Sequence, residues 1–244
     1  MLSCCESIPS FIRNIAPYTP GKPVTELARE MGLNPQHIIK LASNENPLGP
    51  SPKALEAIQA MLPEITRYPD GNSFDLKQAL HKHYNLPVES ILLGNGSNEI
   101  LEMIAQVFLR PGDEAIYAQH AFAVYPLAVQ TRGAKGIEVP AHHFGHDLDG
   151  MLSAITQHTK VIFIANPNNP TGTWIPHERI EAFLHAVPSR IVVVLDEAYE
   201  EYLNDEQRSP SLHWLERFKN LIITRTFSKA YGLAGLRIGY SAMH

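Results

Sequence analysis

The residues whose types and spacing could support chemistry gather around Lys229. This lysine follows the apolar run 221–223 and the hydroxyl-bearing Thr226 and Ser228, and Arg237 comes eight residues later. An apolar environment keeps part of a lysine amine unprotonated, and hydroxyls with an arginine can bind an anion. The stretch therefore favours an amine nucleophile beside an anion site. A strand end whose lysine reaches to solvent fits this stretch alone equally well.

A second group of such residues ends the apolar run 191–195, where Asp196 and Glu197 stand together. Magnesium sites of P-loop nucleotidases look similar, but they need a G-x-x-x-x-G-K-[ST] loop. The only Gly-Lys pair here, at residues 21–22, precedes a proline, so we exclude a nucleotidase. A carboxylate at the apolar base of a cleft pairs better with a cation such as a protonated ring nitrogen. Tyr199 could place a phenol in the same cleft.

Two loops add polar groups that could bind a ligand. Residues 94–99 follow a predicted strand and open a helix, so free N–H groups there could hold a phosphate. Glu99 replaces the third glycine of a dinucleotide-binding fingerprint, and capping by Asn98 is the plain alternative. Residues 166–172, with two Asn-Pro pairs and Thr-Gly, form a defined turn that could also be only a turn.

The elements that must position these groups alternate in type from residue 91 onward. Strand-like apolar runs separated by helical patterns predict βαβ units, hence a mostly parallel sheet covered by helices on both faces. Ligands bind at the carboxyl ends of such strands. The runs are 91–93, 115–117, 161–164, 191–195 and 221–224, and the loops at their ends are 94–98, 119–125, 166–172, 196–199 and 226–229.

The N-terminal part differs in composition. Frequent prolines between residues 7 and 50 exclude one long helix and predict an arm that packs on other parts of the molecule. Ser51 followed by Pro52 is a typical helix start, with an apolar face at Leu55, Ile58 and Leu62. A second amphipathic helix is predicted over residues 73–84.

Composition limits the class of protein. The 244 residues are 44% hydrophobic and 18% charged, with a formal net charge of -5 and no basic cluster, which argues against nucleic acid as a partner. No apolar run is long enough for a membrane span, and no signal peptide is recognisable. Cys4 and Cys5, the only cysteines, are adjacent, which fits a reducing compartment, so we expect a cytoplasmic protein.

The histidines at 142, 143 and 146 have no standard metal-ligand spacing and no cysteine beside them. We therefore expect a solvated loop there and no metal site.

Taken together, the loops resemble the active site of fold-type I aminotransferases that use pyridoxal 5′-phosphate, and most of all the histidinol-phosphate aminotransferase family. The resemblance covers nearly everything after Ile15 and is specific through the order and spacing of its motifs. These stand at residues 16–18 with 20–23, 44–52, 67–69, 166–172, 196–199 and 225–229.

The resemblance implies roles around the cofactor ring. Lys229 matches the lysine that forms a Schiff base with the cofactor and later moves a proton. Asp196 matches the acid that keeps the pyridine nitrogen protonated. Tyr199 and Asn169 match the pair that hydrogen-bonds the ring hydroxyl oxygen, and Phe122 matches the aromatic residue that stacks on the ring.

The family resemblance also implies a site for the cofactor phosphate. It is formed by Ser97, Asn98, Thr226, Ser228 and Arg237.

Three more positions follow from the resemblance. Tyr68 matches a tyrosine that reaches the phosphate of the partner subunit, which implies a homodimer. Tyr18 and Asn44 match residues that face the substrate. The implied substrates are L-histidinol phosphate and 2-oxoglutarate or glutamate, in histidine biosynthesis.

The implied fold is α/β: a three-layer α/β/α large domain with a mostly parallel sheet. We expect residues 1–50 to form the N-terminal arm and part of the small domain, and residues 51–244 to form the cofactor-binding large domain, incomplete at its C-terminal end. Family members continue into a C-terminal small domain that grips the substrate, and the chain ends before it. We therefore expect the chain as it stands to bind cofactor poorly and to turn over slowly or not at all.

One further departure from the family pattern and two rival functions remain. The family usually has Pro-Thr before the stacking aromatic residue, whereas this chain has His120 and Ala121. A threonine-phosphate decarboxylase or an aromatic amino acid aminotransferase shares the scaffold, and a noncatalytic fragment that binds a partner is an alternative of another class.

Overall fold

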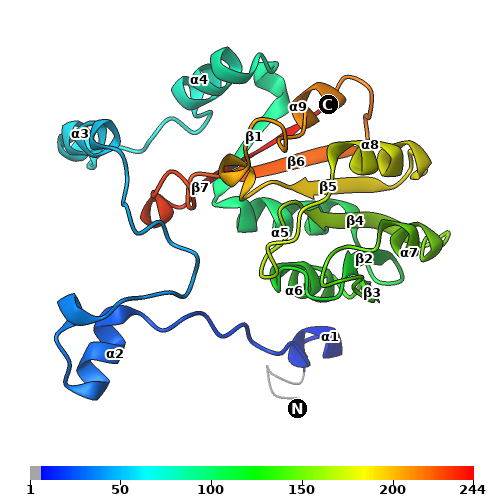
Figure 1. Cartoon of the computed structure of the whole chain (residues 1–244), viewed down its shortest axis with the longest axis horizontal. Helices are drawn as coiled ribbons and strands as arrows, with labels where there is room; N and C mark the ends of the chain where they lie inside the picture. Colours follow the sequence, from blue (N-terminus) through cyan, green and yellow to red (C-terminus); the bar gives the residue numbers. More distant parts are fainter. Residues whose placement is uncertain (1–6) are drawn as a thin grey trace.

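A seven-stranded sheet in the order β1-β7-β6-β5-β4-β2-β3 forms the centre of the protein, whose computed structural model describes residues 7–244 (Figure 1). β7 runs antiparallel to both of its neighbours, β1 and β6, and the other four neighbouring pairs are parallel. The predicted mostly parallel sheet is therefore confirmed. Its strands are β1 (Ile91–Asn95), β2 (Glu114–Ala118), β3 (Lys135–Val139), β4 (Thr159–Ala165), β5 (Val192–Asp196), β6 (Leu221–Thr226) and β7 (Ile238–Met243).

Burial and composition together explain which strands the sequence pattern predicts. β2, β4, β5 and β6 lie inside the sheet and consist almost wholly of buried residues, so their sequences read as continuous apolar runs. β3 is an edge strand with mostly exposed residues. Its lysine, glycine and glutamate interrupt any apolar run, so the sequence pattern does not predict it. β7 is rich in small residues and carries no long apolar run. These two strands were not predicted.

Helices cover both faces of the sheet, which confirms the three-layer α/β/α architecture. α5 and α6 pack on one face, and α1 contacts α6 there (Figure 1). α7, α8 and α9 pack on the other face, where α4 contributes Leu80 to the core. The helices are α1 (Ser10–Arg13), α2 (Val24–Met31), α3 (Pro52–Met61), α4 (Phe74–Tyr84), α5 (Ser97–Phe108), α6 (Val124–Thr131), α7 (Leu148–Ser153), α8 (His177–Ala186) and α9 (Ser211–Trp214). Short 3-10 helices are η1 (Pro35–His37), η2 (Leu62–Glu64), η3 (Val88–Ser90), η4 (Glu200–Tyr202) and η5 (Ala234–Leu236).

The two faces carry two separate hydrophobic cores because successive side chains of a strand point to opposite sides. In β4, Val161 and Phe163 join the core beneath α5 and α6, whereas Ile162 and Ile164 join the core beneath α7 and α8. The same alternation continues to the ends of β5 and β6. It decides which face of the sheet each polar residue there can reach.

The arm and α3 lie at the edge of this body. Gln130 of α6 donates from its side chain to the carbonyls of Phe11 (3.4 Å) and Asn14 (3.2 Å), which anchors the start of the arm. α3 begins at Pro52 as predicted, and its N-cap Ser51 accepts from a backbone N–H of the first turn. However, α3 has no buried residue, so its predicted apolar face is not covered by the described residues. Figure 1 shows α3 standing apart from the sheet.

None of the helices formed by residues 7–244 combines the length and apolar character needed to cross a bilayer. The prediction made from Cys4 and Cys5 lies outside the described residues.

Candidate active site

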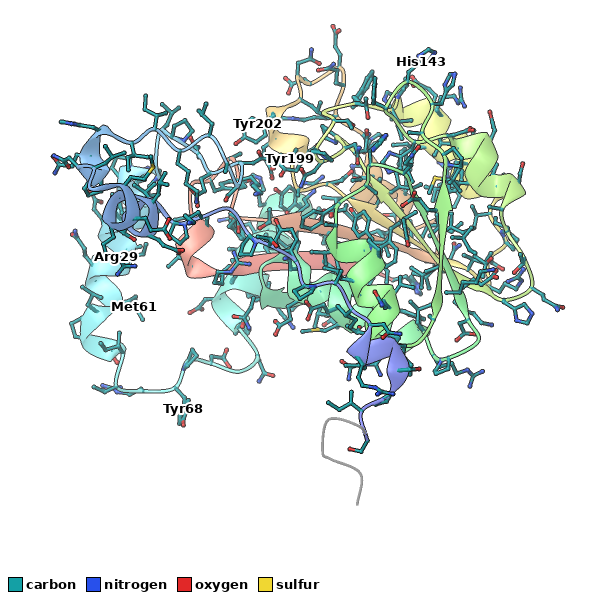
Figure 2. The ribbon with its side chains drawn as sticks, turned by 90° about the horizontal axis from the view of Figure 1, so that it is seen from below. Arg29, Met61, Tyr68, His143, Tyr199 and Tyr202 are labelled. Atoms are coloured by element: carbon teal, nitrogen blue, oxygen red, sulfur yellow. The ribbon has the colours of Figure 1, made fainter. Side chains whose placement is uncertain are left out.

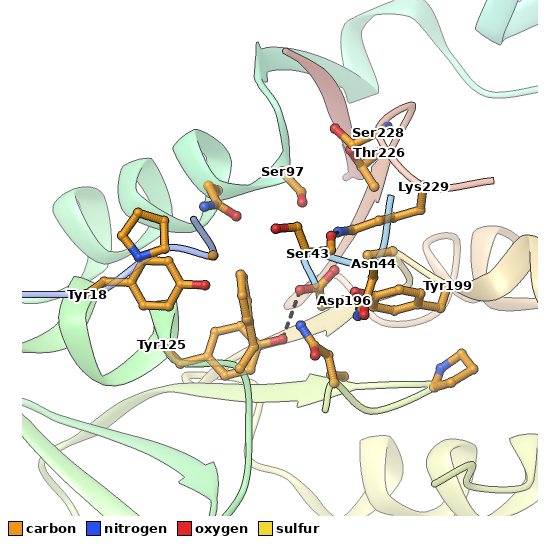
Figure 3. A pocket seen from close by; sticks show the side chains of 18 of the residues that line it. Tyr18, Ser43, Asn44, Ser97, Tyr125, Asp196, Tyr199, Thr226, Ser228 and Lys229 are labelled. Atoms are coloured by element: carbon orange, nitrogen blue, oxygen red, sulfur yellow. Dashed lines mark hydrogen bonds between the residues drawn. The ribbon is translucent and has the colours of Figure 1, made fainter. Parts of the chain in front are cut away.

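A cavity of about 470 Å³ opens at the carboxyl ends of the parallel strands (Figure 3). All five predicted loops contribute to it, together with two segments of the arm. Its size is in the range of small-molecule sites. The sequence-predicted residues that line it are Tyr18, Asn44, Ser97, Asn98, Phe122, Asn169, Asp196, Tyr199, Thr226, Ser228, Lys229 and Arg237.

Asp196, the last residue of β5, lies at the buried base of the cavity. One carboxylate oxygen accepts from the Tyr125 hydroxyl (2.9 Å) and the other from the Thr224 hydroxyl (3.0 Å). Burial raises the pKa of this carboxyl, whereas these two hydroxyls and the Ala198 N–H lower it. The result is an acid with restricted solvent access and fixed orientation, suited to pairing with a cationic ligand group.

Glu197 points away from the cavity, because strand alternation sends it to the opposite face of the sheet. Arg225 donates to one of its oxygens from Nε (2.9 Å) and from one terminal nitrogen (2.8 Å). The guanidinium also lies 3.7 Å from Glu200 and 5.2 Å from the ring centre of Tyr84. The two adjacent carboxylates therefore have separate roles, and only Asp196 faces the cavity.

Lys229 lines the same cavity as Asp196. Its Nζ donates to the carbonyl oxygen of Ser43 (2.9 Å) and lies 5.6 Å from the ring centre of Tyr199. Burial lowers the pKa of the lysine, and the nearby Arg237 lowers it further. A larger fraction of the amine is therefore uncharged near neutral pH than in an exposed lysine, as nucleophilic chemistry requires.

Tyr199 is oriented by the arm, because the side-chain amide of Asn44 donates to its hydroxyl (2.9 Å). Burial raises the pKa of this phenol, so it stays protonated near neutral pH. The structure thus joins two predicted residues that are far apart in sequence.

The N-terminus of α5 forms a cradle suited to an anion. Gly96, at a φ of 79°, is the N-cap, and no side chain caps the helix. Capping by Asn98, the alternative considered from the sequence, is therefore wrong. A β-carbon at Gly96 would collide with the Arg237 guanidinium, which donates to the Ser228 hydroxyl (3.3 Å) and to the Asn95 carbonyl (3.2 Å). Uncapped N–H groups, a helix dipole and an arginine thus converge at one point.

The asparagine-rich loop after β4 is held by its own side chains. Asn166 exchanges two hydrogen bonds with the backbone of Ile175 (2.8 and 3.0 Å), and the Asn168 amide donates to the His120 carbonyl (3.1 Å). The peptide bonds before Pro167 and Pro170 are cis. This framework leaves Asn169 to line the cavity.

His146 corrects the expectation of a solvated histidine loop. His142 and His143 are exposed, but the His146 ring turns inward and its Nε2 accepts from the Ala165 N–H (3.2 Å) at the end of β4. Burial lowers its pKa to about 4, so the ring is neutral near physiological pH. Among the described residues, no group of three or more histidine, cysteine or acidic side chains is placed to hold a metal ion.

Tyr68 is the one predicted site residue that lies outside the cavity. Its side chain is fully exposed, and Figure 2 shows it at the tip of the loop between α3 and α4, pointing away from the body and from Tyr199.

Sequence reasoning missed several lining residues, of which Tyr125 and Ser43 make direct contacts to predicted ones. Tyr125 stands three residues after Phe122, which precedes α6, and its N–H donates to the Phe122 carbonyl (3.0 Å). This spacing within one turn was the available signal. Ser43 acts through its carbonyl, which no side-chain pattern reveals. The other missed lining residues are Pro20, Gly21, Ala165, Pro167 and Ala198.

Known proteins resemble this chain closely. The sequence profile of the family described as aminotransferase class I and II matches residues 36–244. The histidinol-phosphate aminotransferase of Methylobacillus flagellatus is 62% identical over 95% of this chain and 63% of its own length. Histidinol-phosphate aminotransferase 2 of Nitrosospira multiformis is 56% identical over 100% of this chain and 62% of its own length.

A solved structure shows the same fold. The histidinol-phosphate aminotransferase of Sinorhizobium meliloti, crystallised in complex with pyridoxal 5′-phosphate, superposes with a TM-score of 0.88 at 32% identity, over 97% of this chain and 63% of that one. The chain thus spans somewhat over three fifths of the length of the proteins it matches. The profile match, the shared fold and the cavity at the strand ends agree, and the chain belongs to the class I and II aminotransferase family.

Proposed function

We propose that this chain carries the cofactor site of an aminotransferase that moves an amino group between L-histidinol phosphate and 2-oxoglutarate with pyridoxal 5′-phosphate, in histidine biosynthesis. One observation carries the proposal: a buried acid, a lysine with a lowered pKa and an uncapped helix N-terminus line a single cavity. The names of the relatives above support the choice of substrate.

The residues of the cavity fit this cofactor. Its ring carries a basic nitrogen, an aldehyde, a hydroxyl and a phosphate, and each has a matching partner among the lining side chains. Gly96 supports the fit at the phosphate group of the cofactor, because a β-carbon at this position would displace the Arg237 guanidinium from the N-terminus of α5. When bound, pyridoxal phosphate supplies an aldehyde that can take up an amino group and a protonated ring that withdraws electrons from the substrate Cα.

The side chains around the ring would divide the work as follows. Asp196 would hold the proton on the ring nitrogen. Lys229 would bind the aldehyde carbon and, once released, its Nζ would take the proton from the substrate Cα. Tyr199 and Asn169 would hydrogen-bond the ring hydroxyl oxygen, and Phe122 would cover one ring face.

The phosphate would be held at the N-terminus of α5. Ser97 and Asn98 would offer N–H groups and side chains, Thr226 and Ser228 their hydroxyls, and Arg237 a charged fork.

The arm would complete the substrate side. Tyr18 and Asn44 line the cavity and would face the substrate. We propose that residues 1–50 form this arm together with part of a small domain, and that residues 51–244 form the cofactor-binding domain. Exposed apolar side chains in the arm, such as Ile39, Leu41 and Leu48, support a further covering element there.

We also propose a homodimer in which Tyr68 reaches the phosphate site of the partner subunit. α3 buries none of its residues in one chain, and its last residue Met61 and the following Leu62 and Ile65 are exposed. A second copy would cover this surface. Sedimentation of the wild-type protein and of an Ile65→Glu variant tests this: we expect a dimer that the introduced charge weakens, and a wild-type monomer would refute the proposed dimer.

We also propose a cytoplasmic location. Residues 7–244 contain no cysteine and so need no oxidising compartment.

The test of the function is a panel of amino donors with 2-oxoglutarate and pyridoxal phosphate, assayed on the complete gene product because slow or no turnover is expected of residues 1–244 alone. L-Histidinol phosphate should be the preferred donor, measured as glutamate formed, and Lys229→Ala should abolish the transfer. Carbon dioxide released from O-phosphothreonine, or faster transfer from aromatic amino acids, would replace the proposed substrate by one of the rivals. No reaction with any donor, in a protein that binds the cofactor, would favour a noncatalytic fragment.

A further inference from the structure

Tyr125 is a fully buried residue at the start of α6, and its hydroxyl group is directed at the candidate site. The hydroxyl donates to one oxygen of Asp196 (2.9 Å), as the dashed line in Figure 3 shows. The ring stacks on Phe163 at a centroid distance of 4.9 Å and meets Phe122 edge-on at 5.8 Å. Packing on two sides therefore fixes where the hydroxyl lies.

The other groups around Asp196 show what this hydroxyl adds. Thr224 of β6 donates to the second oxygen, so each carboxylate oxygen receives one hydroxyl. Glu197 raises the pKa of Asp196 and so disfavours its charge, and the phenol of Tyr199 and the amine of Lys229 also face it. Burial raises the pKa of Tyr125 well above its usual value, so this residue remains a donor at every working pH.

We propose that Tyr125 is a positioning residue, whose hydroxyl fixes the Asp196 carboxylate in the orientation and ionised form that a protonated pyridine nitrogen needs. The role rests on the proposed function, because only a cofactor with such a nitrogen uses it. A phenylalanine would make the same ring contacts with Phe163 and Phe122. Core packing alone therefore does not require a tyrosine, whereas a buried carboxylate does require a donor.

The test compares wild type with Tyr125→Phe, which removes only the hydroxyl. Tyr117→Phe is the matched control, because Tyr117 is a buried tyrosine of β2 whose hydroxyl lies against Gly136 rather than Asp196. The first measurement is the titration of the Asp196 carboxyl carbon by NMR without cofactor, assigned with Asp196→Asn. The second is the affinity for pyridoxal phosphate and for its analogue with C–H in place of the ring nitrogen, with thermal unfolding as a check of the fold.

Loss of a hydrogen bond to a charged group should raise the pKa of Asp196 by about one unit and weaken pyridoxal phosphate about tenfold. The affinity for the analogue should not change, since it offers Asp196 no cation, and Tyr117→Phe should change neither quantity. Equal losses for both ligands, or an unmoved Asp196 titration, would overturn the positioning role and leave Tyr125 a packing residue. If the complete gene product, measured in parallel, binds neither ligand, the proposed function fails, and the cofactor-free titration then decides the role of Tyr125 alone.

Discussion

Replacing Arg225 with methionine should destabilise the protein far more than replacing any exposed arginine. The side chains of Arg225 and Glu197 are 5% and 2% exposed, and two hydrogen bonds join them. Methionine fills most of the same space but leaves Glu197 buried without its cation. Removing one partner of such a pair costs about 3–5 kcal/mol, which lowers the folded-to-unfolded ratio by about two to almost four orders of magnitude.

The pH dependence gives the same prediction a second check. Burial raises the pKa of Glu200 and of Glu201, and Arg225 opposes both shifts. Without the arginine, the folded state holds protons on these carboxylates at a higher pH than the unfolded state does. A carboxylate whose pKa is higher in the folded than in the unfolded state stabilises the fold at pH values below its unfolded pKa. This stability contribution is lost as the pH rises through its folded pKa. The deficit of Arg225→Met should therefore shrink as pH falls from 8 toward the usual glutamate pKa of about 4.5.

Urea unfolding followed by circular dichroism measures both effects. Arg217→Met is the control, because Arg217 forms an ion pair with Glu181 while its side chain is 52% exposed. Exposed pairs contribute about 0–1 kcal/mol, so this variant should remain close to wild type. The reasoning is refuted if Arg225→Met costs no more than Arg217→Met, or if its deficit does not change with pH.

Three further predictions concern His146, Gly96 and Lys229. Burial lowers the pKa of His146 from about 6.5 in the unfolded chain to about 4 in the folded protein. The stability contribution of the neutral ring is therefore complete above pH 6.5 and is lost as the pH falls from 6.5 to 4. His146→Gln, which keeps an acceptor for the Ala165 N–H, should show a flatter dependence of unfolding free energy on pH between 4 and 6.5. Gly96→Ala should lower the affinity for pyridoxal phosphate about tenfold or more while leaving that for pyridoxal, which lacks the phosphate, little changed, because the methyl group displaces Arg237. Burial lowers the pKa of Lys229, so its labelling by an amine reagent, followed by mass spectrometry, should reach half its maximum at a lower pH than that of an exposed lysine; identical profiles would contradict the burial argument.

The sequence predicted most of the sheet because four of its inner strands, β2, β4, β5 and β6, are apolar runs, and the ends of these runs indicated which loops meet. Asp196 could be placed at a strand end from the run before it. That Glu197 points to the opposite face follows from strand alternation, but which of the two faces bears the cavity could not be predicted from the apolar run, because that depends on the loops packed around the end of β5.

Hydrogen bonds between segments that are distant in the sequence could not be predicted either. The Asn44 bond to Tyr199 and the Lys229 bond to the Ser43 carbonyl join the arm to the sheet across more than 150 residues. Neither turn chemistry nor periodicity encodes such a distance. His146 was misjudged for the same reason: the two histidines before it, His142 and His143, are exposed, and only the fold brings the His146 ring to the end of β4.

We propose that one pyridine ring lies between the Asp196 carboxylate and the Lys229 amine. Borohydride reduction of the protein with pyridoxal phosphate, followed by peptide mapping, tests it most directly. We predict a pyridoxyl group on Lys229, with labelling strongly reduced in Asp196→Ala. Labelling spread over exposed lysines, or labelling of Lys229 that does not depend on Asp196, would contradict the account.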